Sequence, residues 1–188
     1  IQMSGGRGDL ATSYLSKKLD NDVNGVSKEL AKLFSEHFKV VPMVSDDMWN
    51  IHYGEKVGGC KPDGQLWYDI KTMQLVAVFE AKKEDEGGNA EERWNDNANT
   101  ASVMNPECKY HTFAIGKGVR KKWIRRQKKS YVEYNKRGLL DSRWTLEEKG
   151  ISYEDIKEIM INTLNEILKK SHKPPVYPKE PQTLNEFM

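Results

Sequence analysis

Residues 61–82 of the chain read KPDGQLWYDIKTMQLVAVFEAK, and this stretch decides the fold. It predicts two short strands joined by a polar turn. The second strand begins with Leu75–Phe79, a continuously apolar run that is typical of a strand buried on both faces. We therefore expect the rest of the chain to be organised around this hairpin.

Two charged side chains follow the apolar run on the same strand. Glu80 and Lys82 are two residues apart, so both leave the strand by one face, where burying them is costly. Asp63 lies at the mouth of the preceding strand and can reach the same point. Two carboxylates and a lysine that converge in this way suit the binding of a divalent metal and a water against a phosphodiester. The alternative is a surface hairpin on which Glu80 and Lys82 form an exposed ion pair.

Each of these residues has an expected role. Asp63 and Glu80 supply hard oxygen ligands for Mg²⁺, and the Ala81 carbonyl is a third candidate ligand. The metal is expected to polarise the scissile phosphate and to lower the pKa of a bound water. Lys82 then orients that water or stabilises the charge that develops on the phosphate.

The composition constrains the function more weakly. Lysine and arginine total 30 and aspartate and glutamate 28, so the net charge of +2 says little about partners. Residues 84–96 are acidic, whereas 117–129 are strongly basic. The cysteines, Cys60 and Cys108, have neither a metal-binding spacing nor a disulfide framework, which favours a reducing cytoplasm. With no leader and no apolar run of membrane-spanning length, we expect a soluble protein.

The 188 residues predict one domain. Its N-terminal part, 10–40, is expected to hold two amphipathic helices, 10–19 and 26–39, with a turn at 21–25. A short strand over 40–44 should lie at an edge because it contains Pro42. Residues 45–60 are interpreted mainly as loop, with a short strand around 49–53.

After the hairpin we expect a helix over 89–104 and a strand over 109–115. This order predicts an α/β fold, a mixed β-sheet flanked by helices, in which the helix crosses between the last two strands. Residues 119–137 are basic and expected to be partly helical, and a turn-rich piece extends to Gly150. Ser152 is expected to cap a final helix over 153–170, and the tail from His172 is extended.

Two motifs resemble a known family. Residues 61–64, KPDG, and 79–82, FEAK, resemble the core of the PD-(D/E)XK nucleases. Residues 88–93, GNAEER, resemble the Gly-Asn-Ala-x-Glu-Arg segment of the EcoRI/MunI-like type II restriction endonucleases in that superfamily. In those enzymes, too, the segment follows the Glu-x-Lys strand and opens a helix that leads to another strand. The resemblance covers roughly residues 60–118.

The resemblance implies a PD-(D/E)XK restriction-endonuclease-like core and a single nuclease domain, with 61–118 as its catalytic and recognition core. It implies Mg²⁺-dependent cleavage of double-stranded DNA by a homodimer at a short palindromic site, and this subgroup favours a central AATT. The catalytic acids and lysine match Asp63, Glu80 and Lys82. The residues that read base edges match Asn89, Ala90 and Arg93, and the acid that supports the arginines matches Glu92. The linker between Lys82 and Gly88 is much shorter than in that family, so the family's DNA-embracing arm is not transferred. The chain is also shorter after Gly118, so contacts to outer base pairs are not transferred either.

The basic run has two interpretations. Following the strand that neighbours the site, it is well placed to contact DNA phosphates, or it only solvates a face. The candidate phosphate contacts are Lys117, Arg120, Lys121, Lys122, Arg125 and Arg126. Likewise, Asn95, Asn97 and Asn99 either approach DNA or form a solvated helix face, and 88–93 taken alone is an ordinary capped helix start.

Two other functions remain open from the sequence. One is a repair, recombination or phage nuclease with the same core and no stringent sequence specificity. The other is a DNA-binding module that has lost cleavage. The presence of Asp63, Glu80 and Lys82 together argues against the second.

Overall fold

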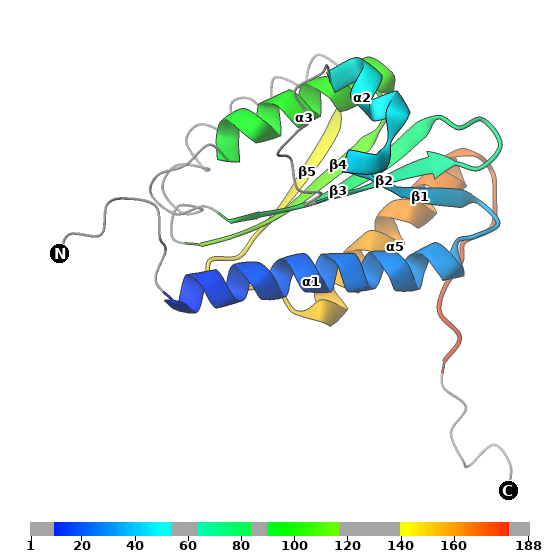
Figure 1. Ribbon diagram of the computed structural model, residues 1–188. Helices are drawn as coiled ribbons and strands as arrows, with labels where there is room; N and C mark the ends of the chain where they lie inside the picture. Colours follow the sequence, from blue (N-terminus) through cyan, green and yellow to red (C-terminus); the bar gives the residue numbers. More distant parts are fainter. Residues whose placement is uncertain (1–9, 54–63, 84–89, 117–139, 181–188) are drawn as a thin grey trace, which may run out of the picture.

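The computed structural model describes residues 10–53, 64–83, 90–116 and 140–180. These residues form a five-stranded mixed sheet with helices on both faces (Figure 1), which confirms the expected α/β class. The strands lie in sequence order as β1 (Phe38–Pro42), β2 (Gly64–Asp69), β3 (Leu75–Lys83), β4 (Lys109–Ile115) and β5 (Asp141–Leu146). The helices are α1 (Leu10–Leu33), η1 (Met43–Ser45), α2 (Asp47–Tyr53), α3 (Ala90–Met104) and α5 (Tyr153–Lys170).

The central strand is β3, as the apolar run predicts. It pairs antiparallel with β2 and parallel with β4, and α3 makes the crossing between the two parallel strands. The hairpin, the crossing helix and the bounds of β4 are thereby confirmed, as is the edge position of β1, the strand with Pro42. Residues 61–63 and Asn89 lie outside the described residues.

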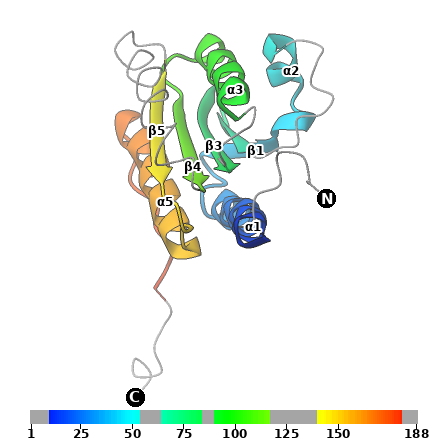
Figure 2. The same ribbon diagram turned by 90° about the vertical axis from the view of Figure 1, so that its left-hand side faces the viewer.

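The sheet separates two layers of side chains. In Figures 1 and 2, α2 and α3 cover one face and α1 and α5 cover the other. Along β3, Ala77 and Phe79 join the core on the α1 and α5 side, whereas Val78 joins the core under α3. Because strand side chains alternate, Glu80 and Lys82 continue the face of Val78 and point toward α3.

The prediction of two N-terminal helices with a turn at 21–25 is wrong, because α1 is continuous. Its inner face is a regular series of buried apolar residues: Leu19, Val23, Val26 and Leu30. Gly25, a turn signal in the sequence, lies inside the helix where α5 passes close. A Cβ at this position would be 3.4 Å from Cε2 of Tyr153. Packing against α5 therefore outweighs the local turn preference.

Two further predictions are corrected. Residues 47–53 form the helix α2 rather than loop and strand: Asp46 Oδ1 accepts a hydrogen bond from the Trp49 amide at 2.8 Å, and Trp49 is buried. The piece before Gly150, interpreted as turn-rich, contains β5. Its charged residues bond each other and neighbouring elements: Arg143 donates to Asp141 within the strand and to Glu166 on α5, and Asp141 also accepts from Lys109 on β4.

The final helix and its cap are confirmed. α5 spans Tyr153–Lys170, and Ser152 Oγ accepts a hydrogen bond from the Asp155 amide at 3.2 Å. The described part of the tail, 173–180, has no helix or strand, and the Asn165 side chain exchanges two hydrogen bonds of 2.9 Å with the Val176 backbone. The tail therefore begins by lying back against α5.

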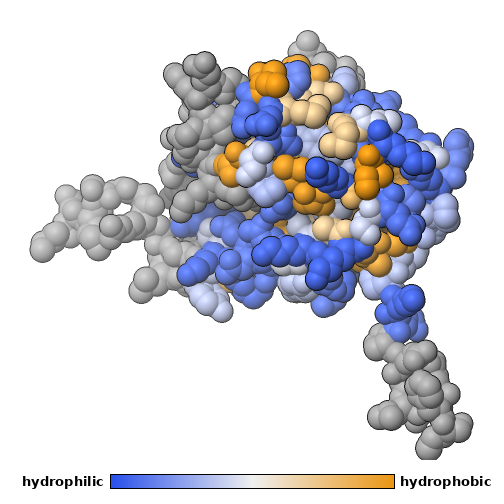
Figure 3. Space-filling model, turned by 45° about the vertical axis from the view of Figure 1, so that its right-hand side comes forward, coloured by the Kyte–Doolittle hydropathy of each residue, from blue (hydrophilic) through white to orange (hydrophobic). Residues whose placement is uncertain are grey.

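Every helix in the described ranges is too short or too polar to cross a membrane. Cys108 is a buried free thiol, and Cys60 lies outside those ranges. Val44, Met48, Ile51 and Val103 are exposed, and Figure 3 shows apolar residues interspersed with polar ones on the face that it presents. Exposed apolar side chains of this kind are ordinary in globular proteins.

An ion-pair network joins β4 and β5 to α5. Arg143 donates two hydrogen bonds to Asp141, each 3.0 Å, and two to Glu166, at 2.9 and 2.8 Å. Lys109 Nζ lies 2.8 Å from Asp141 Oδ2. Burial raises the pKa of Asp141, but the hydrogen bonds from Arg143 and Lys109 outweigh it and hold this pKa below its usual value. The hydrogen bonds from Arg143 also lower the pKa of Glu166.

Arg143→Met is expected to lower the free energy of unfolding by about 1–2 kcal/mol near pH 7, since partly exposed charge-assisted hydrogen bonds are lost. Carboxyl groups with lowered pKa values stabilise the fold above the unfolded-state pKa, and this contribution disappears as the pH falls through the folded-state value. The gap between wild type and variant should therefore shrink below about pH 4. Urea unfolding at several pH values measures the gap.

The control for this prediction is Lys170→Met. Lys170 pairs with Glu107 at 3.1 Å, but the two side chains are 67% and 72% exposed, so we expect a change below about 0.5 kcal/mol. An equal loss in both variants, or a gap that does not depend on pH, would contradict a specific role of the Arg143 network.

Candidate active site

Glu80 and Lys82 form a buried ion pair near the end of β3. Their side chains are 1% and 7% exposed, and Lys82 Nζ lies 2.6 Å from Glu80 Oε1. The interpretation of these residues as an exposed surface pair is therefore wrong. Withdrawing both charges from water carries a desolvation penalty that close pairing and further hydrogen bonds must offset.

Two neighbouring elements supply those further hydrogen bonds to Glu80. Asn97 Nδ2, from α3, donates to Oε1 at 3.1 Å, and the Tyr110 hydroxyl, from β4, donates to Oε2. An ionised carboxylate has about four acceptor positions, two on each oxygen. Among the described residues, Lys82 and Asn97 take both positions on Oε1, whereas Tyr110 takes one on Oε2 and leaves one.

Trp94 fixes α3 above β4 at this point. Its indole Nε1 donates to Thr112 Oγ1 at 2.9 Å, and Thr112 is the residue that pairs with Glu80 in the parallel register. The Trp94 ring also meets the Tyr110 ring edge to face, with centroids 5.9 Å apart. Asn97 lies one turn further along the same face of α3, so Trp94 and Asn97 together set the helix against the carboxylate.

Burial is the main cause that raises the pKa of Tyr110 well above its usual value, and the charge of Glu80 and the hydrogen bond to it add to the effect. Tyr110 is fully buried. Its phenol therefore keeps its proton at neutral pH and acts as a donor toward Glu80.

The described part of the chain contains only some of the expected site residues. Asp63 lies outside it, but the following residue, Gly64, pairs directly with Glu80 across β2 and β3. Ala81 is buried in the core on the opposite face of β3. The expected catalytic lysine and one of the two acids are therefore brought together, next to the strand that Asp63 precedes in the sequence.

The residues expected to read DNA bases lie at the start of α3. Ala90 is the first residue of the helix, as expected, and Arg93 is exposed. Asn89 and the side chains of Ala90 and Glu92 lie outside the described residues. The candidate phosphate contacts also lie outside them: Lys117, Arg120, Lys121, Lys122, Arg125 and Arg126.

The described residues form no cluster of three or more His, Cys, Asp or Glu side chains that could hold a metal ion. Glu80 is the described carboxylate at the site, and its Oε2 retains one acceptor position. A hard oxygen with a defined open direction suits Mg²⁺. Glu80 and the expected ligand Asp63 therefore fit this ion in the chemistry of their donor atoms.

The sequence interpretation missed Tyr110 as a partner of Glu80, and it left Asn97 between DNA contact and solvation. Asn97 is only 6% exposed and faces the site. One signal was present: Tyr110 and Thr112 are two residues apart on a predicted strand, so their hydroxyl groups share one face and need a polar neighbour if that face is buried. The identity of that neighbour follows only from the register of β3 and β4.

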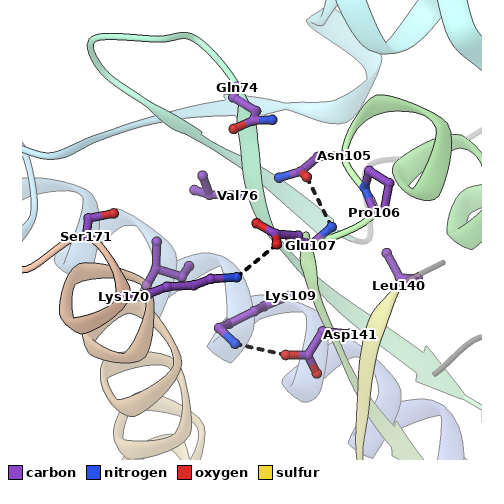
Figure 4. Close-up of a pocket in the computed structure, with 11 residues that line it drawn as sticks. Gln74, Val76, Asn105, Pro106, Glu107, Lys109, Leu140, Asp141, Lys170 and Ser171 are labelled. Carbon is purple, nitrogen blue, oxygen red and sulfur yellow. Dashed lines mark hydrogen bonds and ion pairs between the residues drawn. The ribbon is translucent and has the colours of Figure 1, made fainter. Parts of the chain in front are cut away.

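A cavity of about 590 Å³ lies at the other end of the sheet. It is lined by residues from the beginnings of β3 and β4, by Asp141 of β5 and by the end of α5 (Figure 4). Its lysines are engaged: Lys109 with Asp141, and Lys170 with Glu107. The charges on its wall are therefore balanced within the protein, in contrast to the open acceptor position on Glu80.

Comparisons of the chain with family models, with curated proteins and with solved structures found no match. A functional conclusion therefore rests on the residues themselves. The group with defined chemistry is the Glu80 carboxylate, held by Lys82, Asn97 and Tyr110 at the end of the central strand.

Proposed function

We propose that the chain is a cytoplasmic type II restriction endonuclease with a PD-(D/E)XK core, which cuts double-stranded DNA as a homodimer. One observation carries the proposal: Glu80 and Lys82 are buried side by side at the end of the central strand, and Gly64, the neighbour of Asp63, pairs with Glu80. The order of β3, α3 and β4 supports it, because the same order follows the Glu-x-Lys strand in the enzymes that the sequence resembles.

The proposed chemistry divides among these residues. Asp63 and Glu80, with the Ala81 carbonyl, would hold Mg²⁺, which when bound supplies Lewis-acid activation of a water and of the phosphate. Glu80 Oε1 holds the ammonium of Lys82 within 2.6 Å, so this donor is fixed rather than free to sample many rotamers. Lys82 then donates a hydrogen bond to the attacking water or to a phosphate oxygen as negative charge develops there.

Helix α3 would connect DNA reading with DNA cutting. Its inner face carries Trp94 and Asn97, which set the position of Glu80. Its first turn, which includes Arg93, belongs to the segment 88–93, which we propose reads base edges in the major groove. A rigid helix with both roles would tie the position of the recognised bases to the position of the scissile phosphate. The basic run 117–126 would contact phosphates around the site.

Digestion of a plasmid with the purified chain and Mg²⁺ tests the proposal. We expect discrete fragments whose pattern changes with the plasmid sequence, because a palindromic site recurs at defined positions. Chelation of the metal with EDTA should stop cleavage, and Asp63→Asn should lose it while still binding DNA. A panel of duplexes that share AATT but differ in the flanking base pairs then tests the length of the site.

The other outcomes have definite meanings. A smear of fragments would replace the restriction enzyme with a nuclease of low sequence specificity. Intact plasmid from a folded chain that retards DNA in gels would indicate a binding module without cleavage. Normal cleavage by Asp63→Asn would remove Asp63 from the site.

A further inference from the structure

We propose that Tyr110 is a positioning residue that sets the metal preference of the site, because it fixes the direction in which Glu80 Oε2, the oxygen not covered by Lys82 and Asn97, can bind a cation. This inference rests on the proposed function, since it assumes that Glu80 holds the metal. Tyr110 itself would touch neither the metal nor the DNA. Its effect would pass through the hydrogen bond that its hydroxyl donates to Glu80 Oε2.

The contacts of Glu80 limit the direction in which its carboxylate can bind a cation. Oε1 is covered by Lys82 and Asn97, at 2.6 and 3.1 Å. Both of its acceptor positions are therefore taken, and a cation beside it would also lie close to the ammonium of Lys82. With the described partners, Oε2 has one position left, because the Tyr110 hydroxyl takes the other. The carboxylate can thus offer a single oxygen in a single direction.

Glu80 cannot turn to present both oxygens to a cation without losing its bonds to Lys82, Asn97 and Tyr110. Tyr110 and Trp94 are fully buried, and their rings contact each other edge to face. Trp94 is anchored in turn to Thr112 at 2.9 Å. Donors held by packed aromatic rings keep the orientation of the acceptor that they bind, as outer-shell groups do at metal sites.

Mg²⁺ and Ca²⁺ differ in how they bind a carboxylate. Mg²⁺ requires near-octahedral geometry at short distances and binds few protein carboxylates, usually through one oxygen each. Ca²⁺ accepts more ligands at longer distances and often binds both oxygens of one carboxylate. A carboxylate fixed as a one-oxygen ligand therefore favours Mg²⁺. Removal of the Tyr110 hydroxyl would leave Oε1 covered but give Oε2 a second direction of approach and allow the carboxylate to turn, which relaxes the fixed geometry that Mg²⁺ requires more strictly than Ca²⁺.

Tyr110→Phe tests the inference, because phenylalanine keeps the ring that packs edge to face against Trp94 and removes only the donor. The probe is Mn²⁺ bound to the full chain, followed by the electron paramagnetic resonance signal of the free ion and displaced by Mg²⁺ or Ca²⁺. We expect the ratio of Mg²⁺ to Ca²⁺ affinity to fall about tenfold in the variant. The measurement requires no DNA cleavage.

Tyr68→Phe is the matched control. Tyr68 is a second buried tyrosine in the same apolar cluster, and its raised pKa is caused by burial and by Asp46 rather than by Glu80. Its substitution should leave the affinity ratio unchanged. Thermal unfolding of both variants accounts for any general loss of stability.

The outcomes separate the inference from the proposed function. An unchanged affinity ratio in Tyr110→Phe, or an equal fall in the affinity for both metals, would overturn the role of Tyr110. Equal Mn²⁺ binding by wild type and by Asp63→Asn and Glu80→Gln variants would instead overturn the metal site on which the inference rests.

Discussion

Glu80→Gln is expected to reduce the rate of Mg²⁺-dependent DNA cleavage by at least about a thousandfold, because the site loses the negative charge that binds the metal. Glutamine keeps the shape of the side chain. Its amide oxygen can still accept from Lys82 and Asn97, and its amide nitrogen can donate to the Tyr110 oxygen. The fold and the affinity for DNA should therefore persist, with a modest loss of stability beside the Lys82 ammonium.

Single-turnover cleavage of a duplex, together with gel retardation without metal, measures the two properties separately. Glutamine is a better choice than alanine here, since alanine would remove the acceptor from three buried donors at once and confuse lost chemistry with lost folding. Glu107→Gln provides the matched control: its carboxylate is 72% exposed at the other end of the sheet. Wild-type cleavage by Glu80→Gln, or an equal loss in Glu107→Gln, would refute the assignment.

The sequence predicts much of the fold, because the relevant patterns are local. The run Leu75–Phe79 predicts a central strand, and the two-residue spacing of Glu80 and Lys82 predicts a shared face. The strand over 109–115 and the helix over 153–170 are bounded by Gly116 and by the Ser152 cap, which are also local signals. Each of these predictions is confirmed.

The missed features depend on contacts between distant segments. Asp141 and Arg143 make β5 look like a polar turn, yet their charges are satisfied by Lys109 and by Glu166 on α5. Gly25 signals a turn, yet it lies where Tyr153 packs against α1. Tyr110 pairs with Val78 in the parallel register of β3 and β4, and Glu80 lies two residues further along the same face of β3. Only this register brings the Tyr110 hydroxyl to the Glu80 carboxylate. Such partners follow from the tertiary arrangement, which single-sequence patterns do not specify.

The burial of Glu80 and Lys82 has an energetic cost. The apolar face of β3 could have continued with an aliphatic pair, but it carries two charges that are 1% and 7% exposed. Buried ion pairs rarely stabilise a fold more than well-packed apolar residues of similar volume. Stability alone therefore does not explain the charges at Glu80 and Lys82.

Lys82→Met is expected to lower the free energy of unfolding by about 3–5 kcal/mol, because the buried Glu80 carboxylate loses its adjacent positive charge. Adding Glu80→Gln to this variant removes that charge while keeping an acceptor for Asn97. The double variant should therefore be more stable than Lys82→Met alone. We expect a coupling energy between positions 80 and 82 of about 2–3 kcal/mol from urea unfolding of the wild type, both single variants and the double variant.

The magnitude of this coupling decides between a buried pair and an exposed one. Lys170 and Glu107 form the matched exposed pair, for which the corresponding cycle with Lys170→Met and Glu107→Gln should give less than about 1 kcal/mol. A coupling of that small size between positions 80 and 82 would mean that the Lys82 ammonium is hydrated in solution, which contradicts its burial. A large coupling combined with loss of cleavage in the double variant would show that Glu80 and Lys82 act as one buried pair and that cleavage requires their charges.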